Sequence, residues 1–397
     1  MRLAALSPRQ WMPLSTIITA ATTIVVGFVS TIPIVTDAAR SLGASPDQAA
    51  SWVAALCYGM AITTFILSLY YRMPVITAWS TPGAVLIATS AQASGYQFAE
   101  ALGAFIFAGA LMCVTALVKP LARAIERIPA SIAAAMLAGV LVRYCLNVPS
   151  AIKAEPWMLL PLTLLFIAIR MWKPVIAVPI TVAAGIGAVF ALGQMQGPLP
   201  GFGITALSWT TPQFDVATII GIGVPLYLVS MASQNLPGFA VLRLAGYKPP
   251  VPASLMTTGL GSIALAPFGA HSVTMAAITA ALCTGKDCHP DPAKRWLVAP
   301  PYLILYSALG LVSGSFVALL AGLPQPIFTT LAGLALLSPL LGAFQGMAKD
   351  PDDIDAAAIA FLVTAANVSF FGIGAAFWGL IAGLALHMVK EGLRKKA

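Results

Sequence analysis

The chain has 397 residues, of which 59% are hydrophobic and only 9% charged, and its mean hydropathy is +0.91. A soluble domain carries about 25% charged residues, so this composition excludes a soluble globular protein and indicates an integral membrane protein. The formal net charge of +8 belongs to the loops between membrane segments, and it therefore does not indicate a nucleic-acid partner.

Divided at its charges and its Pro and Gly clusters, the sequence predicts an all-α polytopic membrane protein of 14 transmembrane segments, seven in residues 1–197 and seven in 198–397. The first segment is longer than a signal-peptide core and is expected to be retained. The first-half segments lie near 14–36, 49–70, 74–92, 98–119, 128–145, 156–170 and 174–194. The second-half segments lie near 214–242, 251–264, 265–284, 296–320, 327–346, 355–369 and 371–389. Several are too short to cross about 30 Å of hydrocarbon, so we expect them to be broken, paired or re-entrant.

The loop charges predict the orientation. If both termini are cytoplasmic, every Lys and Arg except Arg40, Arg143 and Lys153 falls on the cytoplasmic side, as the positive-inside rule requires. We therefore expect a multi-pass protein of a bacterial-type inner membrane with an even number of segments. Because seven is odd, the second half enters the membrane from the opposite side, and the halves are predicted to be inverted repeats.

The third segment is interrupted at Ser80-Thr81-Pro82-Gly83-Ala84. Lipid cannot hydrogen-bond the backbone groups that such a break frees, so the break must be buried in protein or line a cavity. The preceding run Val75–Ser80 is rich in β-branched residues and is predicted to be an extended strand. A helix is predicted to start at Thr81, with Ser80 or Thr81 as its N-cap and Pro82 in its first turn.

The tenth segment has a similar break at Ala266-Pro267-Phe268-Gly269-Ala270-His271. Gly83 and Gly269 lie 186 positions apart, and this offset aligns the two breaks. Here Ser262–Ala266 is expected to be the extended run, and a helix is expected to start near Pro267 or Phe268. Breaks at corresponding places in two halves of a membrane protein indicate a transporter's substrate site.

Two helix N-termini would then meet near the bilayer midplane. A helix N-terminus presents unpaired N–H groups and about half a positive charge, which suits a carboxylate. We therefore expect the amides near Gly83, Ala84, Gly269 and Ala270 to bind an anion, and Gly permits a close approach of the ligand. The alternative is that these small residues only allow tight helix contacts.

His271 is the only ionisable side chain that the predicted segments place deep in the membrane. An intramembrane ionisable group is a functional candidate. When neutral, its ring donates or accepts a hydrogen bond, and when protonated it can pair with a carboxylate. His271 is thus a candidate for coupling proton and anion binding. The alternative is a neutral histidine that bridges helices.

Gln234 and Asn235 lie in the eighth segment, where an amide is costly unless it bonds a partner or a ligand. Both are candidates for substrate contact, with a protein partner as the alternative. Phe268 is a candidate for stacking on an aromatic ring, as are Trp79 and Phe28, although aromatic side chains are common in any membrane core.

The loop Cys283–Asp291 carries Cys, His and Asp but lacks the paired spacing of a zinc site, so neither a metal nor another cofactor is predicted. A nucleotide-binding loop and the paired acids of an intramembrane enzyme are not found in the sequence either. A channel is disfavoured because the segments contain few charges with which to line a water-filled path.

Four stretches together resemble a known family, the benzoate membrane transporters of the BenE type, which are proton symporters of aromatic carboxylates. They are Ser80–Ala84, Gln234–Gly238, Pro267–Ser272 and His289–Pro292. This family is distantly similar to nucleobase/proton symporters and to sulfate-type anion carriers. The resemblance implies a core domain from about 14–120 and 214–321 and a gate domain from about 125–195 and 326–390. It also implies alternating access, with a homodimer left open.

The expected function is therefore import of benzoate or a similar aromatic carboxylate with a proton. Another organic or inorganic anion, a nucleobase or an anion channel are the alternatives. The nucleobase relatives keep acidic residues where this chain has Gln234, Asn235 and His271. The departure fits an anionic substrate, because a buried carboxylate would repel it. The proton carrier stays open between His271, the substrate carboxylate and a water-linked site.

Overall fold

The computed structural model describes residues 13–118, 129–197, 201, 203–276, 278–368, 370–371 and 373–394. The predicted loop around residues 119–128, with its three cationic side chains, and both chain ends therefore lie outside the described residues. In the first half the elements are α2 (Leu14–Ile24), η1 (Val25–Val29), α3 (Ser30–Ser41), α4 (Pro46–Tyr71), β1 (Thr77–Trp79), α5 (Thr81–Ser94), α6 (Phe98–Leu117), α8 (Ala130–Ala154), α9 (Pro156–Trp172) and α10 (Pro174–Ala191).

The second half follows the same order of helices, strand and helices. Its elements are α11 (Val216–Thr218), η2 (Ile219–Gly223), α12 (Val224–Ser230), η3 (Met231–Asn235), α13 (Leu236–Leu244), α14 (Val251–Leu265), η4 (Ala266–Phe268), β2 (Val273–Met275), α15 (Ile278–Cys283), η5 (Pro292–Val298), α16 (Ala299–Leu311), α17 (Ser313–Ala321), α18 (Gln325–Met347), η6 (Pro351–Asp353), α19 (Ile354–Ala366) and α20 (Ala375–Arg394).

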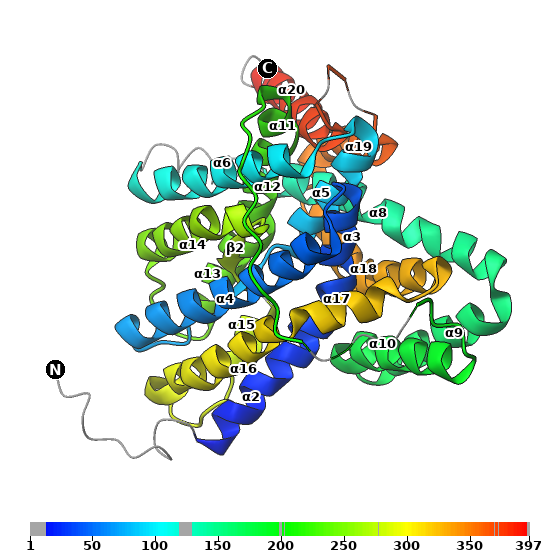
Figure 1. Ribbon diagram of the computed structural model, residues 1–397. Helices are drawn as coiled ribbons and strands as arrows, with labels where there is room; N and C mark the ends of the chain where they lie inside the picture. Colours follow the sequence, from blue (N-terminus) through cyan, green and yellow to red (C-terminus); the bar gives the residue numbers. More distant parts are fainter. Residues whose placement is uncertain are drawn as a thin grey trace.

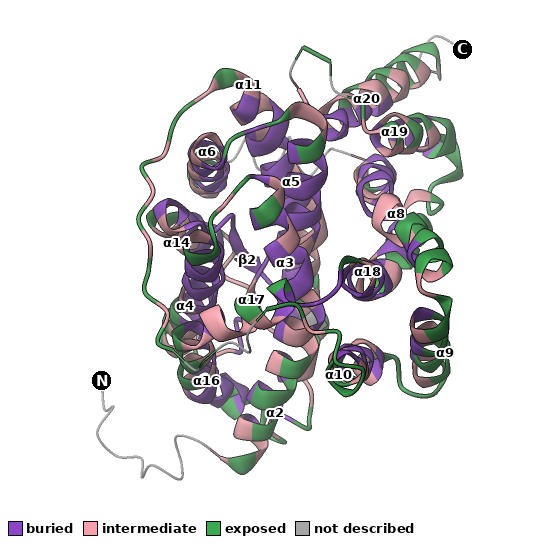
Figure 2. Ribbon diagram, turned by 45° about the vertical axis from the view of Figure 1, so that its right-hand side comes forward, coloured by how far each residue is buried: buried purple, intermediate pink, exposed green. Residues whose placement is uncertain are grey.

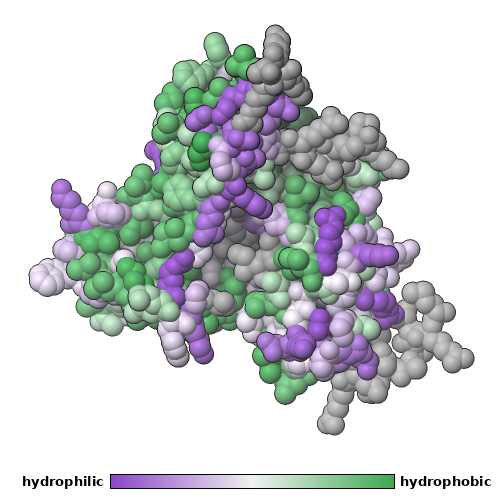
Figure 3. Space-filling view, turned by 180° about the vertical axis from the view of Figure 1, so that it is seen from behind, coloured by the Kyte–Doolittle hydropathy of each residue, from purple (hydrophilic) through white to green (hydrophobic). Residues whose placement is uncertain are grey.

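The helices have the length and composition of a polytopic membrane protein. Within the described residues, seven helices are long and apolar enough to cross a membrane, or eight if the pair that bends by 52° between Leu311 and Ser313 counts as one. Large apolar side chains also point outward, including Trp157 at 94% and Met171 at 84% exposed. Figure 3 shows broad hydrophobic areas on one face, which is hollowed near its centre. Such a surface is stable only against lipid or another apolar partner.

For description we divide the helices into a larger group, α2 to α6 and α11 to α17, and a smaller group, α8 to α10 and α18 to α20. In Figures 1 and 2, α4, α6, α14 and α16 lie on one side and α8, α9, α10 and α18 on the other, with α3 and α5 between them. The principal contacts in the larger group are α4 with α16 and α6 with α14, and in the smaller group α8 with α18 and α19 with α20.

A π-helical turn interrupts the first helix of each half. η1 covers Val25–Val29 and η2 covers Ile219–Gly223, and each has a glycine at its centre, Gly27 and Gly221. A third π turn, η3, ends at Asn235. A π turn adds a residue to the helix, re-aims the following side chains and is frequent at functional sites.

The two broken segments pair with each other. β1 and β2 are antiparallel, with Thr77 opposite Met275 and Trp79 opposite Val273. The ladder satisfies backbone groups that lipid would leave unpaired. In the third segment the local prediction and the structure coincide, since β1 lies inside the extended run and α5 begins at Thr81 with Ser80 as its N-cap.

In the tenth segment the predicted order was wrong. Residues 262–265 are the end of helix α14, and the strand comes later, at 273–275. Pro267 lies in a single 3₁₀ turn, and Gly269 closes that turn with a φ of +103°, so no helix starts near Pro267 or Phe268. Glycine adopts this conformation without the steric cost that a Cβ brings. The helix that follows the strand is α15, which begins at Ile278.

Residues 203–215 form a connecting segment that carries no helix or strand and crosses the ends of the larger group. Four of its backbone N–H groups donate hydrogen bonds to residues of four different elements. These bonds are Thr205 to the Leu311 carbonyl, Ser208 to Ser51 Oγ, Thr210 to the Pro267 carbonyl and Gln213 to the Ala99 carbonyl, all between 2.7 and 2.9 Å. The segment thus ties the ends of α16, α4, η4 and α6 together.

Gly269→Ala is expected to lower the midpoint of thermal unfolding in detergent. Its Cβ would lie 2.7 Å from Cβ of Trp52, and the positive φ alone costs about 1–3 kcal/mol for a non-glycine residue. Gly342→Ala in α18 is the control, because a Cβ there meets nothing within 4 Å, and it should leave the midpoint unchanged or raise it. Equal midpoints for the two variants would contradict the left-handed turn.

Candidate functional site

A cavity of about 100 Å³ lies where the two broken segments meet the first helix of each half. An apolar cavity of about 150 Å³ holds benzene, so this space is on the scale of a single ring. Its walls come from η1, α3, α4, β1, α5, η3, α15 and α16. The lining residues are Val26, Gly27, Thr31, Met60, Ala78, Trp79, Thr81, Gln234, Ala276, Thr279 and Tyr306.

The start of α5 shows which donors remain free at the cavity. Ser80 is fully buried, its Oγ accepts from the Gly83 N–H at 3.0 Å, and its carbonyl accepts from the Ala84 N–H at 2.9 Å. The amides of Gly83 and Ala84 are therefore already used. Among the described residues no hydrogen bond uses the N–H or the hydroxyl of Thr81, which lines the cavity.

The second wall is built by the residues that follow β2. The N–H of Ala276 donates to the Ile76 carbonyl at 2.9 Å and prolongs the ladder by one bond. α15 then begins at Ile278, and Thr279 reaches the cavity from its first turn. Because α5 and α15 follow antiparallel strands, they leave the ladder in opposite directions. The cavity is thus lined by a threonine from the first turn of each helix, Thr81 and Thr279.

Gln234 and Asn235 have different surroundings although they are adjacent. Gln234 is half-buried and lines the cavity, and its amide has no partner among the described residues. Asn235 is fully buried; its Oδ1 accepts from the Met275 N–H at 2.8 Å, and its Nδ2 points to the sulfur of Met231 at 3.2 Å. The free amide of the pair is Gln234, whereas Asn235 holds β2 against η3.

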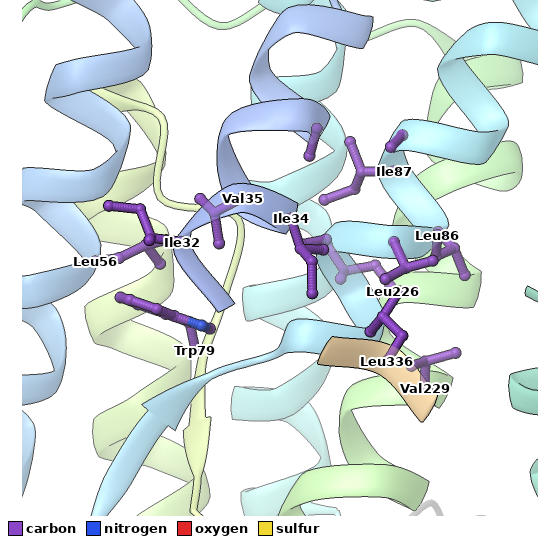
Figure 4. Packing of buried hydrophobic residues seen from close by; sticks show 14 of the residues in the cluster. Ile32, Ile34, Val35, Leu56, Trp79, Leu86, Ile87, Leu226, Val229 and Leu336 are labelled. Carbon is purple, nitrogen blue, oxygen red and sulfur yellow. The ribbon is translucent and has the colours of Figure 1, made fainter. Parts of the chain in front are cut away.

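Aromatic side chains form the apolar part of the site. The Trp79 indole N–H donates to Thr31 Oγ1 at 2.9 Å, and its ring lies 5.8 Å from Phe28. Tyr306 packs on Tyr302 with ring centroids 4.4 Å apart. Figure 4 shows Trp79 among the buried apolar side chains of this region, with Ile32 and Leu56 nearby. Partners on several elements therefore fix the rings that face the cavity.

His271 is fully buried and does not line the cavity. Its Nδ1 is 3.0 Å from the Trp52 indole nitrogen, and its Nε2 is 2.9 Å from the Ser80 carbonyl. Because an indole N–H only donates and a carbonyl only accepts, Nδ1 must be the acceptor and Nε2 must carry the proton. The ring is therefore neutral, and it connects α4 to the N-cap of α5.

The other predicted site residues of the tenth segment belong to the turn after α14. The N–H of Gly269 donates to the Ala266 carbonyl at 2.8 Å, and that of Ala270 donates to the Leu265 carbonyl at 3.2 Å. Phe268 packs edge-on against Trp209 of the connecting segment at 5.4 Å. None of the three lines the cavity. The structure thus brings Thr81 and Gln234 together and places Phe268, Gly269 and Ala270 elsewhere.

The prediction of site residues did not include Thr31, Ala276, Thr279 and Tyr306, and it considered Trp79 only as one of several aromatics. For Ala276 and Thr279, the sequence did contain a signal of their position. Ser272-Val273-Thr274-Met275 has the β-branched character of a strand. Aligned on the strands, the two halves are offset by 196 positions, which puts Ala276 and Thr279 at the places of Ser80 and Gly83.

His271→Ala is expected to destabilise the protein by about 1–3 kcal/mol for each buried group left unpaired, the Trp52 N–H and the Ser80 carbonyl. Thermal unfolding in detergent measures this loss. The control is His289→Ala, whose half-buried ring lies in a loop and bonds only to Asp291. A His271→Ala protein of unchanged stability that had lost only its pH dependence would contradict the bridging geometry.

Comparison with solved structures shows the fold. The transmembrane domain of a cyanobacterium bicarbonate transporter, BicA, matches with a TM-score of 0.62 at 15% identity, covering 93% of this chain and 97% of that chain. The chain thus shares the overall fold of that transmembrane domain.

The family follows from the sequence. The model of the family described as benzoate membrane transport protein matches residues 10–389. The inner membrane protein YdcO of Escherichia coli is 39% identical over 95% of this chain and 96% of its own length. The benzoate membrane transport protein of Acinetobacter baylyi is 31% identical over 89% of each. The chain belongs to the benzoate membrane transport protein family and is a membrane transporter.

Proposed function

We propose that this protein carries benzoate or a close aromatic carboxylate together with a proton, and that its substrate binds in the cavity between the broken segments. The observation that carries the proposal is the composition of the cavity wall, which joins aromatic and aliphatic side chains to unpartnered polar groups. A ring and a carboxylate need these two kinds of surface side by side.

The carboxylate would bind at the polar end of the cavity. The Thr81 and Thr279 hydroxyls and the Gln234 amide can all donate to it, and the N-terminus of α5 adds a partial positive charge. None of the described residues that line the cavity is charged. An anion therefore meets no repulsion there, while the ring would pack between Trp79 and Tyr306.

We also propose fourteen membrane segments in two inverted halves, with both termini cytoplasmic. Contacts repeated between corresponding elements support this arrangement. α4 packs on α16 as α6 packs on α14, α3 on α5 as α13 on α15, and α9 on α10 as α19 on α20. The π turns η1 and η2 and the strands β1 and β2 also occupy matching places. The larger group would be the core and the smaller group the gate.

Alternating access would move the core against the gate and expose the cavity to each side in turn. One proton carried with one monoanion makes the cycle electroneutral, so the pH gradient would drive uptake with about 1.4 kcal/mol per pH unit. We assign His271 a bridging role in this cycle, because both ring nitrogens are engaged and the ring lies outside the cavity wall.

Proteoliposomes with an imposed pH gradient test the function. The wild type should accumulate radiolabelled benzoate, and Gln234→Ala should weaken its binding about tenfold or more, because a hydrogen bond to a charged group contributes about 1.5–3 kcal/mol. Gln234→Glu should weaken it further through charge repulsion. Gln92→Ala is the matched control, since Gln92 is exposed on α5 and bonds to Ser41 outside the cavity.

Competition and driving force separate the alternatives. Unlabelled sulfate or uracil that blocks uptake better than aromatic carboxylates would overturn the proposed substrate. Uptake that follows the membrane potential at fixed pH would overturn the stoichiometry. If Gln234→Ala and Gln234→Glu both take up benzoate as the wild type does, the proposal that the substrate binds in this cavity is wrong.

A further inference from the structure

A carboxylate joins the larger group to the smaller group. Asp37 of α3 accepts a hydrogen bond from the Tyr144 hydroxyl of α8 at 2.6 Å. The predicted first segment ended at residue 36, so Asp37 was placed in a loop, but the helical run continues to Ser41. Asp37 is half-buried, and its helical neighbours Thr36 and Ala38 are buried. It thus lies within a candidate membrane span.

Asp37 has no ion pair among the described residues. Arg40 follows one turn later, but its guanidinium lies over the Phe328 ring of α18, 4.9 Å from the centroid. A carboxylate in a membrane segment without a direct cationic partner is costly to keep ionised. Two groups therefore stabilise its charge: the Tyr144 hydroxyl through its hydrogen bond, and the Arg40 guanidinium through a charge interaction without direct contact.

The other elements packed against α3 bring little charge to this carboxylate. α5, α10, α18 and η1 contain no ionisable side chain. α4 has Asp47 in its exposed first turn, buried Cys57, half-buried Tyr58, and Tyr70 and Tyr71 at its last two positions. On α8, Arg143 and Cys145 flank Tyr144, and Lys153 lies near the end of the helix. Protonation of Asp37 would thus change the charge where core and gate touch.

Asp37 is also connected to the cavity. α3 continues directly from the π turn η1, and Val26, Gly27 and Thr31 of this run line the cavity. Thr31 and Asp37 are six residues apart, or about 9 Å along a helix. A change at Asp37 can therefore reach the substrate through one continuous helical segment.

We propose that Asp37 is the binding site of the transported proton and that its protonation weakens the hydrogen bond that holds the core to the gate. The inference rests on the proposed symport and names the site of its coupling ion. Water on one side gives a proton to the Asp37 carboxylate, and Tyr144 keeps its own phenolic proton. The charge-assisted bond becomes a weaker neutral one. The core moves with its bound monoanion, and Asp37 returns the proton to water on the other side.

Infrared difference spectra of the full-length protein in lipid test proton binding without any substrate. As the pH is lowered, the wild type should gain a C=O band of protonated carboxyl groups, and the difference between the spectra of the wild type and Asp37→Asn should isolate the contribution of Asp37 to this band. Tyr144→Phe removes the hydrogen bond to the ionised form, so the midpoint of the titration should move to higher pH by about 1–2 units. Asp47→Asn is the control and should keep the band.

Transport tests the coupling. Asp37→Asn should lose benzoate accumulation under a pH gradient but keep exchange of benzoate across the membrane, now independent of pH. Asp47→Asn should behave as the wild type does. Full accumulation by Asp37→Asn, or an unchanged titration midpoint in Tyr144→Phe, would overturn the inference. If the wild type moves no benzoate while the band still depends on Asp37, the proposed substrate fails and the proton site stands.

Discussion

The constraint on which this structure depends is that lipid offers no hydrogen bonds to a broken helix. Two segments are broken, and each satisfies the other: β1 pairs with β2, and the Tyr302 hydroxyl donates to the Thr77 carbonyl at 2.8 Å. His271 bonds the Ser80 carbonyl. A spanning segment can afford a break only when such partners replace the lost helical bonds. The centre of the molecule is therefore a shared polar framework inside an apolar protein.

The cavity is a consequence of the same framework. Helices that cross at short strands cannot pack as closely as continuous helices, and Gly27, Ala78 and Ala276 add no bulk at the crossing. What remains is a space with aromatic walls and a few free polar groups. The framework residues, among them Asn235, keep their hydrogen bonds within the protein, whereas Thr81 and Gln234 face the space. Residues that hold the framework together therefore lie next to residues that face the cavity, as Asn235 lies next to Gln234.

Local sequence was sufficient for the first break and insufficient for the second. Ser80, Thr81 and Pro82 contain the complete signal of a helix start, because a cap and a first-turn proline act within one turn. Pro267 and Gly269 look alike in sequence, but there the glycine has a left-handed φ and lies against Trp52. That contact joins residues 217 positions apart. No local pattern contains it, so the predicted helix start was wrong. The amides of Gly269 and Ala270 bond within the turn instead of opening a helix.

The pairing of β1 with β2 also constrains how the protein is made. The partner of Thr77 is Met275, so the edge of β1 stays open until almost 200 further residues have been synthesised. At about 5–20 residues per second this interval is roughly 10–40 s. Throughout this interval the Ser80 carbonyl and the Trp52 indole lack their hydrogen-bond partner His271, which has not yet been synthesised. The nascent first half must therefore be kept at a membrane site where water, a chaperone or the insertion machinery covers its open strand.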